Sequence, residues 1–103
     1  MRSFAIYCSG NASTIRQFYS LNDNINKYPP TKIIYDGTNQ IVLNKLYLLF
    51  GEDTTSYFDI NKLTEKDKRK INTVTTNFIY NVMIDNHVEY LLCFGTRIIK
   101  KKC

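Results

Sequence analysis

Short apolar runs alternate with amphipathic segments along this chain, and small or polar residues separate them. The apolar runs predict four strands, at residues 3–8, 32–36, 56–60 and 89–94. Apolar positions spaced three and four residues apart predict helices at residues 13–22, 40–50 and 65–86.

Strictly alternating strands and helices are typical of parallel sheets with right-handed crossover connections. The sequence therefore predicts an α/β fold, an incomplete three-layer Rossmann-like open parallel sheet of about four strands with crossover helices. The first and fourth strands have apolar residues at consecutive positions, which is typical of strands buried on both faces.

Polar and glycine residues mark where each predicted helix begins or ends. Ala12 or Ser13 lies at or next to the start of the first helix, and the Ser13 hydroxyl suits the N-cap. Thr38 or Asn39 is the predicted N-cap of the second helix, whose end is marked by Gly51. The third helix is predicted to follow a capping-box variant at residues 64–67.

Composition narrows the class of protein. The 103 residues, 44% of them hydrophobic and 22% charged, fit one globular domain. The net charge of +5 comes partly from residues 65–70, where signs alternate, and from lysines at residues 100–102. This pattern favours a solvated surface over a nucleic-acid site, although a small basic nucleic-acid binder stays as a minor alternative.

Cysteine content and hydropathy argue against further classes of protein. Three cysteines without a CxxC pair disfavour a disulfide scaffold and a zinc ribbon, so we expect no metal. No apolar run reaches the ~20 residues of a membrane span, and the first residues lack a signal-peptide core. We therefore expect a cytoplasmic protein without a membrane partner.

Two segments should meet where ligands bind in open α/β sheets, beyond the carboxyl ends of the strands. They are residues 8–13 and 94–97. Free N–H groups in the first segment, helped by Gly10 and nearby hydroxyls, could bind a phosphate. A tight connection capped by Ser13 explains the same residues equally well. The single glycine excludes the GxGxxG fingerprint, and the lack of a following GK[ST] excludes a P-loop.

The remaining reactive side chains have simpler explanations. His87 is expected at the opposite end of the sheet, as a surface residue. Cys8 and Cys93 are expected as small core residues. Asp36 and Asp59 end predicted strands and are expected mainly to cap the following turns. A cation at Arg97 is expected at the mouth of the crevice, unless it is simply a solvated surface residue.

Residues 4–13 (FAIYCSGNAS) and 88–99 (VEYLLCFGTRII) together resemble a known family. The first segment is similar to the opening strand and "SGNGS" loop of the formyltransferase superfamily. The second is similar to its "D-x-x-x-x-x-G-x-x-R-I-L" strand and turn. The nearest match in motif is its phosphoribosylglycinamide formyltransferase branch. Residues 1–103 would then form the front half of the formyl transferase amino-terminal domain.

The resemblance implies transfer of a formyl group from 10-formyltetrahydrofolate to a primary amine of a phosphorylated substrate, as in purine biosynthesis. That substrate would be a ribonucleotide or a nucleotide-linked amino sugar. The implied phosphate-binding residues are Ser9, Gly10, Asn11, Ala12 and Ser13. The implied folate-binding residues are Phe94, Gly95, Thr96, Arg97, Ile98 and Ile99. Two residues depart from the family pattern: Ala12 replaces a loop glycine, and Thr96 stands where methionine is common.

The family's chemistry uses an Asn, a His and an Asp that follow the arginine-bearing turn. The sequence ends at Cys103, before such a segment, so no catalytic residue is assigned and a truncated or inactive form is expected. The alternative is a non-catalytic α/β ligand-binding or protein-interaction module. The fourth strand, expected beside the first with an uncovered edge, predicts self-association through residues 89–94.

Overall fold

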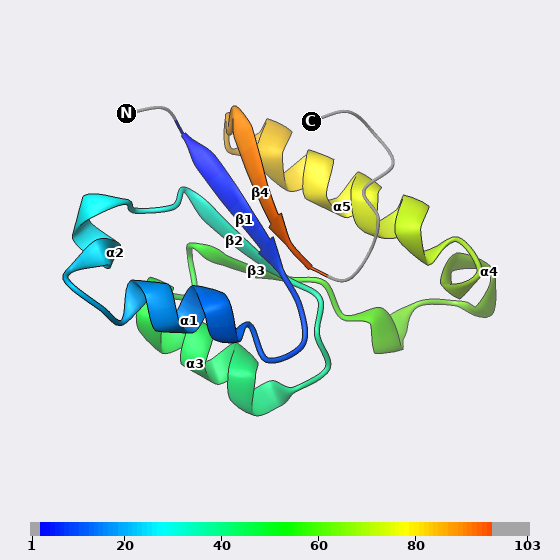
Figure 1. Cartoon of the computed structure of the whole chain (residues 1–103). Helices are drawn as coiled ribbons and strands as arrows, with labels where there is room; N and C mark the ends of the chain where they lie inside the picture. The colour runs from blue at the N-terminus through cyan, green and yellow to red at the C-terminus, as the bar shows by residue number, and fades with distance from the viewer. Residues whose placement is uncertain (1–2, 96–103) are drawn as a thin grey trace.

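Four parallel strands form the centre of the molecule, in a computed structural model that describes residues 3–95 (Figure 1). The strands are β1 (Phe4–Cys8), β2 (Lys32–Tyr35), β3 (Thr55–Tyr57) and β4 (Tyr90–Phe94). They lie in the order β3-β2-β1-β4, so the strand nearest the amino terminus is central. The predicted open parallel α/β sheet is confirmed.

Helices cover both faces of this sheet and make the predicted three layers (Figure 1). They are α1 (Ser13–Tyr19), α2 (Asn24–Lys27), α3 (Gln40–Phe50), the 3-10 turn η1 (Ile60–Lys62), α4 (Glu65–Lys68) and α5 (Ile71–Asp85). The helices α1 and α3 pack on one face, and α5 packs on the other. The prediction of one helix at residues 65–86 is wrong. The backbone leaves helical geometry at Lys70, so the segment forms two helices, α4 and α5.

The core has two parts, one on each side of the sheet. The larger part joins Ile6, Cys8, Ile33 and Tyr35 of β1 and β2 to buried residues of α1 and α3. The smaller part packs Ala5, Tyr7 and Ile34 against Ile79 and Met83 of α5. Consecutive residues of β1 and β2 therefore face opposite layers, and both strands are buried on both faces as their apolar runs predict.

Helix starts follow the predicted capping chemistry at two of three sites. The Asn39 side chain accepts hydrogen bonds from the N–H groups of Ile41 and Val42, and Thr64 accepts one from Asp67. The predicted cap at Ser13 is wrong. Ala12 is the N-cap residue, in a left-handed conformation with φ 49°, so Ser13 is already helical and its hydroxyl does not cap the helix.

The fourth strand differs from its prediction as a strand buried on both faces. Tyr90, Leu92 and Phe94 of β4 are 48%, 46% and 49% exposed, because α1 and α3 cover β1 and β2 rather than this edge. Cys93 is also exposed, so its predicted place in the core is wrong. Cys93 pairs in register with Tyr7, and Cys8 pairs with Phe94, so the two cysteines are not directly opposite each other.

Within residues 3–95, no helix has the length and apolar character that a membrane crossing requires.

Candidate functional site

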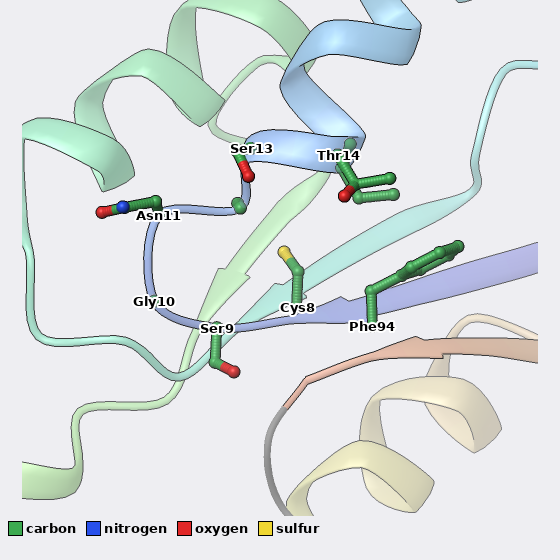
Figure 2. A pocket seen from close by; sticks show the side chains of 9 residues that line it. Cys8, Ser9, Gly10, Asn11, Ser13, Thr14 and Phe94 are labelled. Carbon is green, nitrogen blue, oxygen red and sulfur yellow. The ribbon is translucent and has the colours of Figure 1, made fainter.

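The loop Ser9–Ser13 leaves the carboxyl end of β1 and leads directly into α1. Gly10 and Ala12 both have positive φ angles, of 60° and 49°, and the Ala12 N–H donates to the Ser9 carbonyl at 3.1 Å. The loop borders a hollow of about 340 Å³, which residues 8–15 and Phe94 line (Figure 2). The structure thus brings the five predicted loop residues and Phe94 to one place.

The side chains around this hollow are not equivalent. Figure 2 shows the hydroxyl groups of Ser13 and Thr14 pointing from the first turn of α1 toward Cys8. The side chains of Ser9 and Asn11 point away from this group. Thr14 was not predicted as a site residue. Its position directly after Ser13, in the first helical turn, could have indicated it. The hollow therefore presents hydroxyl donors from α1 more than side chains from the loop.

Two side chains from outside the loop hold its backbone. The Tyr35 hydroxyl donates to the Gly10 carbonyl at 2.6 Å, and Arg16 Nε donates to the Asn11 carbonyl at 2.9 Å. Neither residue was predicted as part of the site. Arg16 lies one turn into α1, where its helical spacing from Ala12 and Ser13 could have indicated it. Arg16 is half-buried and places a positive charge beside the loop.

The Cys8 thiol beside the hollow is buried and not activated for reaction. Burial raises the pKa of the Cys8 thiol to about 12, and the nearby Asp36 carboxylate adds to this rise. Cys8 is therefore a neutral thiol near pH 7 and not an activated nucleophile.

The two acidic residues that end strands have different roles. Asp36 is 1% exposed and accepts a hydrogen bond from the Tyr7 hydroxyl at 2.6 Å. This partner is a buried tyrosine on the neighbouring strand β1, and the expectation that Asp36 caps the turn after β2 stays a prediction. Asp59 does cap the turn that follows it, by accepting from the Asn61 N–H at 3.0 Å.

The predicted folate segment is described only at its start. Phe94 lines the hollow, and Gly95 packs so closely on the Tyr7 ring that any Cβ there would collide with it. Thr96, Arg97, Ile98 and Ile99 lie outside the described residues. Their predicted role stays a prediction, as does the expected position of Arg97 at the mouth of the crevice.

His87 lies far from this site along the strands, as predicted. It is exposed, precedes β4, and accepts a hydrogen bond at its carbonyl from Ser3 Oγ at 3.0 Å. This position is at the amino end of the parallel sheet, whereas the hollow lies at the carboxyl end of β1. Among residues 3–95, no group of three or more His, Cys, Asp or Glu side chains could hold a metal ion.

Comparison with known proteins adds one match. No protein-family model matches the chain, and no curated protein matches it. Among solved structures, the chain is similar to the crystal structure of phosphoribosylglycinamide formyltransferase from Streptococcus pneumoniae TIGR4, with a TM-score of 0.63. The fold is formyltransferase-like.

This formyltransferase-like fold extends over nearly the whole chain. The match covers 98% of this chain and 48% of the enzyme's chain, at 15% sequence identity. The chain therefore spans about half the length of the formyltransferase that it matches. The resemblance drawn from residues 4–13 and 88–99 is confirmed for the fold, and the roles of individual residues are treated as proposals below.

Proposed function

We propose that residues 1–103 are the front half of a formyltransferase domain, and that the loop Ser9–Ser13 binds the phosphate of its amine substrate. The family reaction transfers a formyl group from 10-formyltetrahydrofolate to a primary amine. The observation that supports this proposal is the hollow between the loop and Phe94, at the carboxyl end of the central strand of a formyltransferase-like fold.

The donors around the hollow suit an anion. The first backbone N–H groups of a helix have no partner within that helix, and the N-cap residue Ala12 makes no side-chain hydrogen bond to α1. The hydroxyls of Ser13 and Thr14 add side-chain donors, and Arg16 places a positive charge at the Asn11 carbonyl of the loop. A phosphate bound there would meet hydroxyl donors, with no carboxylate among the described lining residues.

The departure at Ala12 is compatible with phosphate binding. Ala12 has the left-handed backbone that glycine adopts most easily, so the loop keeps a glycine-like path at an energetic cost. The Ala12 side chain is buried in the core and does not fill the hollow. We infer that the methyl group anchors the loop and leaves its outer surface open to a ligand.

We propose that the folate co-substrate lies next to the phosphate site, along Phe94–Ile99. The Phe94 side chain is half-exposed and lines the hollow, which would provide an apolar wall for a ring system. The acceptor would be a ribonucleotide amine or a nucleotide-linked amino sugar, because either presents a phosphate at a distance from the reacting nitrogen.

The contribution proposed for these residues is binding and orientation. The 103 residues contain no Asn-x-His-Pro segment, and the Cys8 thiol stays protonated near pH 7. We therefore assign no proton transfer or covalent step to any residue of this chain. Holding the amine substrate by its phosphate would still restrict its position relative to the formyl donor.

Isothermal titration of the 103-residue chain tests the proposal. We expect a phosphoribosyl amine to bind saturably, and the same amine without its phosphate to bind at least ~10-fold more weakly. Replacing Thr14 with valine should weaken binding by about 5-fold, because one hydroxyl donor is lost. The same change at exposed Thr73 of α5 should have no effect. Equal affinity for the two ligands would contradict phosphate recognition.

A further inference from the structure

The path of the loop Ser9–Ser13 depends on a tyrosine from another strand. Tyr35 is fully buried at the end of β2, and its ring is stacked on that of Tyr57 with centroids 6.1 Å apart. Its hydroxyl donates to the Gly10 carbonyl at 2.6 Å, across a separation of 25 residues. The loop is therefore fastened to the sheet by one side chain whose own position is fixed by packing.

This bond fixes the direction of the next N–H group. Peptide bonds in the described chain are not cis, and in a trans peptide the carbonyl and the following N–H point in opposite directions. Because the Gly10 carbonyl points toward Tyr35, the Asn11 N–H points away from Tyr35 and the sheet. Arg16 holds the Asn11 carbonyl in the same way, and the Ala12 N–H closes the turn on Ser9.

We propose that Tyr35 is the positioning residue of this loop, holding the Gly10 carbonyl so that the loop backbone is ordered before a phosphate binds. The ligand part of this inference rests on the proposed function, whereas the ordering of the loop does not. Ordering in advance matters because a loop that must be fixed on binding loses conformational entropy at that step.

Two further observations agree with this role. A Cβ at Gly37 would collide with the Tyr35 hydroxyl and ring, so the absence of a side chain at residue 37 permits the Tyr35 geometry. Burial raises the pKa of Tyr35, so its hydroxyl keeps its proton and remains a donor at neutral and mildly alkaline pH. Gly37→Ala should therefore disturb the loop even though Gly37 does not line the hollow.

The chain provides a matched control. Tyr19 is also a buried tyrosine, 5% exposed, and its hydroxyl donates to the Tyr28 carbonyl at 2.8 Å. Tyr19→Phe and Tyr35→Phe each remove one hydroxyl and one bond to a backbone carbonyl. A purely structural role would give the two variants similar losses of thermal stability and similar loops.

The test combines amide hydrogen exchange with ligand titration on the full chain. In Tyr35→Phe we expect the Ala12 N–H to exchange ~10-fold faster than in the unmodified chain, and ribose 5-phosphate to bind ~10-fold more weakly. In Tyr19→Phe we expect neither change. Gly37→Ala should reproduce the effects of Tyr35→Phe.

The exchange measurement decides the inference without a ligand. Ala12 exchange that is the same in Tyr35→Phe and in the unmodified chain would overturn it. If the unmodified chain fails to bind ribose 5-phosphate, the proposed function fails, while the Ala12 exchange rates still support or overturn the role of Tyr35. Binding that is unaffected in Tyr35→Phe, despite faster exchange, would overturn the link between loop order and affinity.

Discussion

Replacing Ser13 with aspartate is expected to weaken binding of a phosphorylated ligand by at least ~100-fold. The new carboxylate would stand where the Ser13 hydroxyl now points into the hollow, and would repel the phosphate at close range. The fold should tolerate the change, because Ser13 is exposed and an acidic residue in the first turn of a helix is favourable. Titration with ribose 5-phosphate, alongside a thermal melt, measures both effects.

The same charge change at the far end of α1 serves as the control. Ser20 follows the helix and is exposed, and Ser20→Asp alters the net charge by the same amount. We expect this variant to bind within about 2-fold of the unmodified chain, because exposed charges at this separation are largely screened. If the two aspartate variants lose affinity equally, the loop is not the phosphate site.

The 103-residue chain is expected to self-associate through β4, and Leu92→Lys is expected to make it a monomer. Within the described residues β4 pairs with β1 and lies at the edge of the sheet. Tyr90, Leu92 and Phe94 add half-exposed apolar side chains, next to exposed Phe18 and Tyr28. Two copies of the chain could pair their β4 strands side by side, which would cover the exposed apolar side chains of each copy.

Sedimentation velocity across a range of concentrations measures this association. Leu48→Lys is the matched control, since Leu48 lies on α3 and is 88% exposed, far more than Leu92 at 46%. We expect the Leu48 variant to associate like the unmodified chain. A chain that stays monomeric at high concentration would contradict the prediction, as would equal behaviour of the two lysine variants.

Patterns within short segments of the sequence were sufficient to predict most of the fold. The apolar runs of β1 and β2 and the helical spacing of α3 are each contained in one short segment, so the sequence indicated them directly. The cap at Asn39 was predictable for the same reason. The position of β4 beside β1 at the edge of the sheet is confirmed, but its exposed side chains were not predicted, because the apolar run of an edge strand looks like that of a central one.

The candidate site likewise has one part that the sequence predicted and another part that it did not. The loop Ser9–Ser13 is continuous in sequence, so a small-residue turn between a strand and a helix was enough to predict it. The side chains that organise the surroundings come from far along the chain. Tyr35 reaches Gly10 over 25 residues, and Tyr7 reaches Asp36 over 29. Such pairs depend on strand order and register, which the sequence pattern does not specify.

Phosphate binding at the loop Ser9–Ser13 is tested most directly by a nuclear magnetic resonance titration of the chain with ribose 5-phosphate, followed at every backbone amide. We expect saturable shifts concentrated at the amides of residues 10–14, the turn and first helical residues that border the hollow. Shifts confined to other surfaces, such as the shallow groove beside Asn44 and Tyr47, would contradict it. So would a titration without saturable shifts at any residue.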